Sequence, residues 1–164
     1  MRDLSNYAFS PLRYGDLRLY RGSGKGLPPI LLVAAENSSL ACLKRLEHEY
    51  ALRAELDADW AAHPIELSRH RNRLALMLED PGGTVLDQLL GQPLGITQFL
   101  RIGISLAWAL RQVHARGLFH KDIKPTNILV DVASGGCLGV SDFLCLSHTL
   151  DQEAEYGDQE RDFG

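Results

Sequence analysis

The sequence predicts an α+β fold, in which a strand-rich first half with one helix precedes a long helix and a short strand hairpin. Short apolar runs bounded by glycine, proline and asparagine dominate residues 7–35, as is typical of strands. Residues 40–56 and 97–116 instead carry apolar residues at helical spacing. The length of 164 residues suits one domain with a substantial core.

The first half is predicted to begin with three strands. Residues 7–12 and 17–20 are short strand candidates, separated by a turn around Gly15-Asp16. The glycine- and proline-rich residues 22–29 are predicted to form a loop without phosphate-loop spacing. Residues 30–35 form a continuous apolar run and predict a buried strand.

A helix and a further strand complete this half. Residues 37–39 are N-cap residues for a helix that should run to about Leu56. Leu74 to Leu78 predicts the next strand, which residues 79–83 close with a turn. A short helix over residues 85–90 should follow.

The clearest helix of the sequence is predicted from about Thr97 to residue 116, with Gly117 ending it. Its apolar residues form two stripes, which predicts a core helix packed from both sides. The stripes are Phe99, Ile102, Leu106, Ala109 and Val113, and Leu100, Ile104, Ala107 and Leu110. Residues 128–130 and 138–140 predict two short strands around a Gly135-Gly136 turn.

Composition excludes several classes of protein. Hydrophobic residues make up 45% and charged residues 23%, as in ordinary globular domains, and no apolar run is long enough to span a membrane. No signal core follows Met1, and three cysteines without a CxxC pair suggest reduced thiols, so a cytoplasmic location is expected. No basic stripe indicates nucleic-acid binding.

The net charge of −4 is concentrated in the last fourteen residues. Residues 151–164 hold six acidic residues against Arg161, a net charge of −5, so the remaining 150 residues carry about +1. A segment of this kind predicts an acidic, disordered tail.

The segment His120 to Leu129 carries the most informative chemistry of the chain. It reads His-Lys-Asp-Ile-Lys-Pro-Thr-Asn-Ile-Leu and places Asp122, Lys124 and Asn127 at offsets of zero, two and five. A carboxylate can accept a hydroxyl proton, a lysine can bind a phosphate, and an amide oxygen can hold Mg²⁺. This layout therefore predicts phosphoryl transfer.

The same segment resembles the catalytic loop of protein kinases, and its Lys-Pro pair resembles the Ser/Thr branch. The resemblance covers about residues 7–148 and implies a protein-kinase-like fold, with a β-rich N-lobe and the first part of a helical C-lobe. Residues 1–80 would form the N-lobe and residues 81–150 the hinge and partial C-lobe. It also implies ATP and Mg²⁺ as cofactors, protein hydroxyls as acceptors, Asp122 as base and Lys124 as phosphate contact.

The metal ligands that the resemblance implies are Asn127 and Asp142. Asp142-Phe143-Leu144 is similar to the Asp-Phe-Gly metal-binding motif, with leucine in place of glycine. A carboxylate at Asp142 suits Mg²⁺, and the lost glycine affects the freedom of the following segment. The final Asp162-Phe163-Gly164 is expected to be a chance match, since it lies 40 residues after Asp122.

The nucleotide-binding residues implied by the resemblance are Gly15, Leu78 and Glu79, together with a glutamate discussed next. Gly15 would lie in the turn that covers the phosphates, although the family has more glycines there. Leu78 and Glu79 would lie in the hinge that binds adenine through its backbone.

Glu49 lies on the apolar stripe of the first helix, and in the family this glutamate pairs with a lysine of the third strand. Here that position falls at about Val33, and the strand contains no lysine. Arg21 or Lys25 are candidate substitutes, and a solvent-exposed Glu49 at the edge of the helix is the other interpretation.

Residues 46–52, 56–67 and 79–83 resemble the N-terminal kinase domains of large bacterial proteins that also carry an ATPase module and a sensor histidine kinase. This implies a truncated chain of low activity, whose partners are a protein substrate or downstream signalling domains. Two alternatives stay open: a non-catalytic, pseudokinase-type nucleotide-binding or regulatory module, and a small-molecule phosphotransferase of the aminoglycoside type, which usually lacks the Lys-Pro pair.

Overall fold

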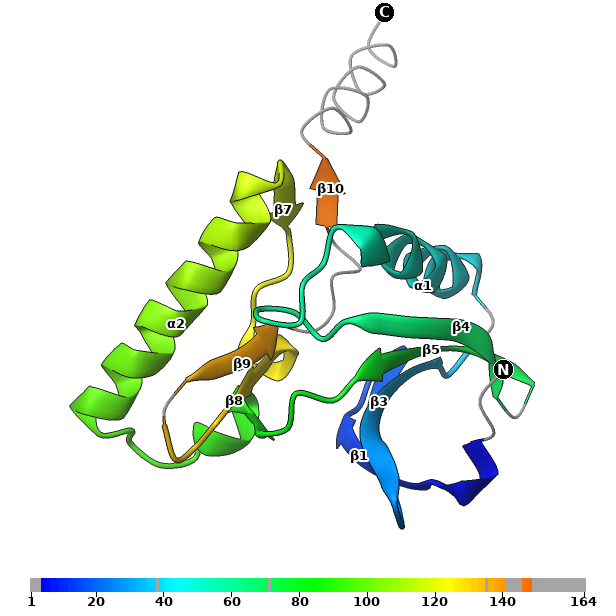
Figure 1. Ribbon diagram of the computed structural model, residues 1–164, viewed down its shortest axis with the longest axis horizontal. Coiled ribbons are helices and arrows are strands. Elements are labelled where there is room, and N and C mark those ends of the chain that lie inside the picture. Colours follow the sequence, from blue (N-terminus) through cyan, green and yellow to red (C-terminus); the bar gives the residue numbers. More distant parts are fainter. Residues whose placement is uncertain (1–3, 38, 71, 135, 141–145, 149–164) are drawn as a thin grey trace, which may run out of the picture.

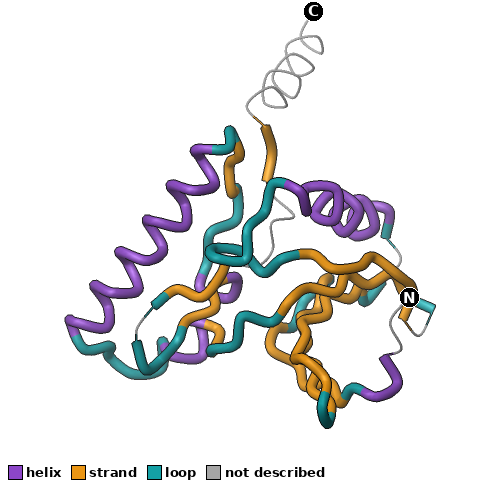
Figure 2. The backbone as a smooth tube through the Cα atoms, in the orientation of Figure 1, coloured by secondary structure: helices purple, strands orange, loops and turns teal. Residues whose placement is uncertain are grey.

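The computed structural model describes residues 4–37, 39–70, 72–134, 136–140 and 146–148. A five-stranded sheet with one helix lies beside a second part built on a long helix and two small sheets (Figures 1 and 2). The α+β arrangement that the sequence predicts is confirmed. Asp142 and the acidic segment 151–164 lie outside the described residues.

The large sheet is antiparallel throughout, with the strand order β1-β2-β3-β5-β4. Its strands are β1 (Ala8–Arg13), β2 (Leu17–Gly24), β3 (Leu27–Ala35), β4 (Pro64–His70) and β5 (Arg73–Glu79). The inner strands β3 and β5 each contain a run of four buried residues, 30–33 and 75–78, whereas most of β4 is only half-buried. This edge strand was not predicted, because its polar residues interrupt any apolar run.

The predicted loop over residues 22–29 is wrong, since β2 and β3 continue through it and turn at Lys25-Gly26. The glycines of this run have a packing role. A Cβ on Gly22 would lie 2.7 Å from a ring carbon of Phe9 and 2.9 Å from Ile30 Cγ1. Glycine therefore lets neighbouring side chains close over the hairpin, and only Gly26, at φ 73°, serves the turn itself.

Helix α1 (Leu40–Ala51) covers one face of the sheet (Figure 1). The Ser39 hydroxyl caps it by accepting a hydrogen bond from the Cys42 N–H at 3.2 Å. Cys42, Leu46 and Glu49 form its buried side, which packs against β3, β4 and β5. The helix ends earlier than predicted, and a 3₁₀ turn over Leu52–Ala54 follows it.

The second part contains helix α2 (Ile96–Ala115), which Gly117 ends with a φ of 72°. The predicted helix near residue 85 is strand β6 (Thr84–Val85) followed by a 3₁₀ turn, Leu86–Leu89. Strands β6, β8 and β9 form one small sheet, and β7 pairs with β10. Their bounds are β7 (Leu118–His120), β8 (Ile128–Val130), β9 (Cys137–Val140) and β10 (Leu146–His148).

One of the two apolar stripes of α2 is mostly buried, apart from Phe99 near its start, which is 58% exposed. Ile102, Ala109 and Val113 lie in the core, whereas Ile104 on the other stripe is 70% exposed. The prediction of packing from both sides is therefore wrong for this structure. The described residues contain no helix long and apolar enough to cross a membrane.

Two isoleucines of α2 provide a matched test of this one-sided burial. Ile102→Ala removes a side chain that is 6% exposed and should lower the free energy of unfolding by about 2–4 kcal/mol. Ile104→Ala on the exposed side should change it by less than about 0.5 kcal/mol. Urea unfolding monitored by circular dichroism measures both. Equal losses would show that both stripes are buried in solution.

Candidate active site

Asp122, Lys124 and Asn127 lie together in the connection from β7 to β8. Lys124 Nζ donates a hydrogen bond to Asp122 Oδ2 at 2.5 Å. Asn127 Nδ2 donates to the Asp122 carbonyl at 2.9 Å and to Asp122 Oδ2 at 3.2 Å. The three side chains that the sequence brings together by spacing are thus joined by hydrogen bonds in the fold.

The local sequence explains this geometry. Lys124 has extended backbone angles, φ −152° and ψ 157°, as expected for a residue before proline. Pro125 begins the 3₁₀ turn Pro125–Asn127, where a missing N–H is tolerated. The Asn127 N–H closes this turn on the Lys124 carbonyl at 2.9 Å. The turn therefore brings the Asn127 side chain within hydrogen-bond distance of Asp122.

Asn127 is completely buried, and both ends of its amide are engaged. Nδ2 donates to Asp122, while Oδ1 accepts a hydrogen bond from Arg13 Nη1 at the end of β1. The amide oxygen therefore faces a cation from the large sheet. A buried oxygen ligand of this kind also suits Mg²⁺.

The pKa of Asp122 is lowered from its ordinary value of 3.8. The Lys124 hydrogen bond is the largest cause, with further lowering by the Lys124 charge and the Asn127 hydrogen bond, whereas burial acts in the opposite direction. The side chain is consequently an ionised carboxylate at neutral pH. An ionised carboxylate can orient a nearby hydroxyl group and can accept its proton.

Lys124→Ala should raise the pKa of Asp122 toward its ordinary value, because the largest lowering interaction is lost. The titration of the Asp122 carboxyl carbon, followed by NMR from pH 7 to pH 2, measures this change. Lys121→Ala is the control, since Lys121 is not among the groups that lower this pKa. An unchanged midpoint in Lys124→Ala would contradict the ion pair.

Glu49 of α1 is fully buried, so the interpretation of a glutamate exposed at the helix edge is wrong. Val33, at the position where the resemblance implies a lysine, is buried in the same core cluster as Cys42 and Leu46 of α1. Strand β3 contains no lysine or arginine. Lys25 is exposed in the turn at the far end of the β2–β3 hairpin from α1.

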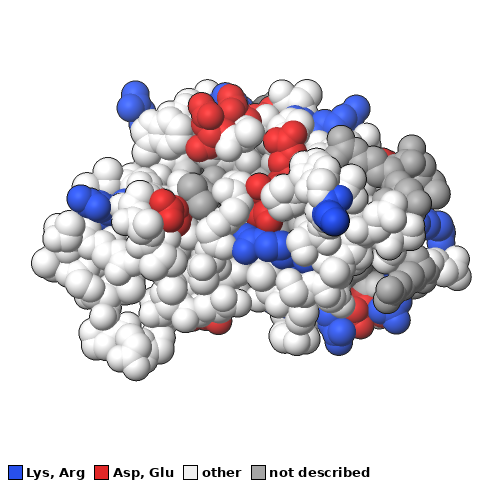
Figure 3. Space-filling model, turned by 60° about the horizontal axis from the view of Figure 1, so that its bottom comes forward, with Lys and Arg blue, Asp and Glu red and all other residues white. Residues whose placement is uncertain are grey.

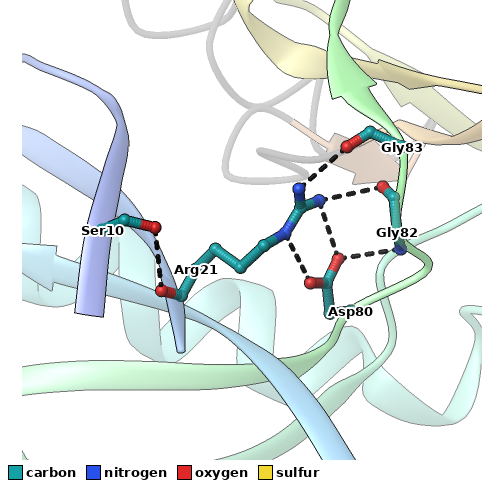
Figure 4. A network of polar contacts seen from close by, with 5 residues as sticks. All are labelled: Ser10, Arg21, Asp80, Gly82 and Gly83. Carbon is teal, nitrogen blue, oxygen red and sulfur yellow. Dashed lines mark hydrogen bonds and ion pairs between the residues drawn. The ribbon is translucent and has the colours of Figure 1, made fainter. Parts of the chain in front are cut away.

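Arg21 binds elsewhere, in a network that joins β2 to the segment after β5 (Figure 4). Its guanidinium donates to both carboxylate oxygens of Asp80, at 2.6 and 3.0 Å. It also donates to the carbonyls of Gly83 at 2.8 Å and Gly82 at 3.0 Å, while the Gly82 N–H donates to Asp80 at 2.8 Å. Arg21 is therefore the partner of Asp80, and sequence reasoning missed this pair.

Three curated proteins similar to this chain are protein kinases. CBL-interacting protein kinase 4 of Oryza sativa is 36% identical over 107 residues, which cover 63% of this chain and 21% of that protein. Serine/threonine-protein kinase cot-1 of Neurospora crassa is 28% identical over 79% of this chain and 22% of its own length. CBL-interacting protein kinase 29 of Oryza sativa is 31% identical over 87% of this chain and 29% of its own length.

The chain is a protein-kinase-like domain. Its antiparallel five-stranded sheet with α1 corresponds to the kinase-like N-lobe arrangement that the resemblance implies. No protein-family model matches the chain. The chain spans between a fifth and a third of the length of these three curated relatives.

The hinge predicted for this kinase-like domain lies at the end of β5. Leu78 is fully buried and pairs with Leu31 of β3 and Pro64 of β4. The Glu79 N–H donates to the His63 carbonyl at 2.9 Å. The Glu79 N–H is therefore engaged within the fold.

Gly15 lies in the turn between β1 and β2 with a φ of 146°, a conformation that favours glycine. A Cβ there would meet no atom closer than the Leu17 carbonyl at 3.9 Å, so the backbone conformation and not space explains the residue. Arg13 precedes this turn and reaches Asn127 from it. The turn thus lies on the side of the sheet that faces residues 122–127.

The second predicted metal ligand, Asp142, lies outside the described residues. Within the described part of the chain, no group of three or more His, Cys, Asp or Glu side chains could hold a metal ion. On the face shown in Figure 3, basic and acidic side chains are interspersed. The metal-binding pair of Asn127 and Asp142 stays a prediction.

Proposed function

We propose that this domain binds ATP with Mg²⁺ and transfers the γ-phosphoryl group to a serine or threonine hydroxyl of a protein. The observation that carries the proposal is the hydrogen-bonded group of Asp122, Lys124 and Asn127. A carboxylate, a cation and a buried amide oxygen are the groups that this reaction requires. The kinase-like relatives support the same reaction class.

In the proposed reaction, Asp122 orients the acceptor hydroxyl and takes its proton as the oxygen bonds to the γ-phosphorus. The bond between that phosphorus and the β-phosphate oxygen breaks, and ADP leaves. Lys124 lies beside Asp122 and would neutralise charge on the transferred group. Asn127 and Asp142 would hold Mg²⁺, which supplies charge neutralisation on the phosphates when it is bound.

The other predicted residues have positioning roles in this proposal. Leu78 and Glu79 would contact adenine through backbone groups, and Gly15 would let the β1–β2 turn approach the phosphates. Buried Glu49 would fix α1 against the sheet. Residues 1–80 and 81–150 would act as the two lobes, and the acceptor would be a protein substrate or a downstream signalling domain.

A second candidate is a pseudokinase-type module that binds nucleotide or regulates a partner without catalysis. The observation that favours it is β3, where Val33 is buried in the core and no cation is present. A lysine at this position normally holds the α- and β-phosphates of ATP. The two proposals agree on nucleotide binding and differ on transfer.

Autophosphorylation with γ-labelled ATP and Mg²⁺, alongside calorimetric ATP binding, distinguishes these proposals. Wild type should bind Mg²⁺-ATP and incorporate label slowly, and Asp142→Asn should lose both the label and the Mg²⁺ dependence of binding. Binding without label in wild type would support the pseudokinase proposal. A protein that binds no nucleotide would contradict both, and label that persists in Asp142→Asn would contradict the metal assignment.

A further inference from the structure

Arg13 occupies a bulged position at the end of β1. The register of β1 with β2 shifts between Pro11, which lies opposite Tyr20, and Arg13, which lies opposite Leu19. A bulge twists its strand and redirects the side chain that follows. Arg13 is half-buried, and it leaves the sheet to reach a residue 114 positions later in the chain.

That residue is Asn127, whose Oδ1 accepts the hydrogen bond from Arg13 Nη1. Nδ2 of the same amide is committed to Asp122. The guanidinium therefore lies at the oxygen that would hold a metal ion beside the phosphates of a bound nucleotide. Arg13 makes this contact from β1, the strand that leads into the β1–β2 turn, and not from β3.

Two other cations considered for this region have roles of their own. Arg21 is bound to Asp80 and to two carbonyl groups. Lys124 is bound to Asp122, where the proposed reaction uses it for the transferred group. Strand β3 supplies no cation. A triphosphate carries several negative charges, and leaving them uncompensated in a partly buried site is costly.

We propose that Arg13 binds the phosphates of the nucleotide and takes over the role of the absent strand lysine. The inference rests on the proposed ATP binding. A guanidinium is a planar fork that can bind two phosphate oxygens at once, so it suits this role. When nucleotide binds, Arg13 turns from Asn127 Oδ1 to the phosphates, and the amide oxygen becomes available to Mg²⁺.

The geometry gives this exchange a specific consequence. Without nucleotide, Arg13 and Mg²⁺ compete for Asn127 Oδ1, so Mg²⁺ alone binds weakly. With nucleotide, the phosphates attract both cations, and binding of Mg²⁺ and ATP becomes mutually favourable. An arginine that merely blocked the site would have the opposite effect, because its removal would strengthen ATP binding.

Calorimetric titrations of the full chain with Mg²⁺-ATP and with adenosine test this assignment. Arg13→Ala should weaken ATP binding by about tenfold or more, since hydrogen bonds between charged groups are lost, and should leave adenosine binding within about twofold. Arg13→Lys should retain part of the ATP affinity. Arg18→Ala is the matched control, because Arg18 lies on β2 and pairs with Glu36 at 3.3 Å.

Each outcome of these titrations decides a separate question. Equal or tighter ATP binding by Arg13→Ala would overturn the role of Arg13 while leaving the proposed function intact. Loss of adenosine together with ATP would also overturn it, because the residue would then be structural. A wild-type protein that binds neither ligand would instead overturn the proposed function, and the inference with it.

Discussion

Asp122→Asn is expected to lower the rate of phosphoryl transfer by about 10³-fold while leaving Mg²⁺-ATP affinity within about threefold. The substitution keeps the size of the side chain but removes the charge that orients and deprotonates the acceptor hydroxyl. Lys124 also loses its ion-pair partner, at a present separation of 2.5 Å. Initial rates with γ-labelled ATP at saturating Mg²⁺ measure the effect.

Asp131→Asn is the matched control for this substitution. The Asp131 carboxylate also has a lowered pKa, because the Ser134 side chain and the N–H groups of Ala133 and Ser134 hydrogen-bond to it in the turn before β9. It therefore shares the ionisation of Asp122 but not its neighbours. A similar loss of rate in both variants, or an unaffected rate in Asp122→Asn, would contradict the catalytic role of Asp122.

Arg21→Ala is expected to lower the free energy of unfolding by about 3 kcal/mol, because it leaves a buried carboxylate without its cation. The Asp80 side chain is 2% exposed, and Arg21 supplies both hydrogen bonds of a bidentate pair to it. The carbonyls of Gly82 and Gly83 lose their donor as well. Guanidinium unfolding monitored by tryptophan fluorescence measures the loss.

Arg18→Ala, on the same strand, should have a much smaller effect, since its ion pair with Glu36 is partly exposed to solvent. The double variant Arg21→Leu with Asp80→Leu, measured together with its two single variants, forms a cycle that isolates the pair. It should be more stable than Arg21→Ala alone, because no charge stays buried. An Arg21→Ala variant as stable as Arg18→Ala would contradict a stabilising role of the Arg21–Asp80 ion pair.

The parts of the site that are local in sequence could be predicted, and the long-range parts could not. Asp122, Lys124 and Asn127 lie within six residues, so their spacing already specified their grouping, which the hydrogen bonds confirm. The contacts of Arg13 with Asn127 and of Arg21 with Asp80 join residues 114 and 59 positions apart. No local pattern reports a partner at such a separation.

The errors in the predicted fold have the same physical origin. The glycines at 22 and 24 suggested a loop, yet Gly22 is required because Phe9 and Ile30 lie where its Cβ would be. Strand β4 was missed because it is a half-buried edge strand, whose sequence shows little periodicity. In α2, apolar spacing predicted burial of Leu100 and Ile104, but both side chains are exposed. Which side of a helix is buried depends on the elements that pack against it, and these come from other parts of the chain.

An NMR titration of the isotope-labelled protein with Mg²⁺-ATP tests the proposed nucleotide site, because it locates the nucleotide. If ATP binds there, the backbone signals of residues 13–16, from Arg13 through the β1–β2 turn, and of residues 122–127 should shift together, with the Arg13 guanidinium and Asn127 side-chain amide signals among them. Shifts confined to a separate pocket that is lined by Tyr20 and His70, or no shifts at saturating nucleotide, would contradict this proposal.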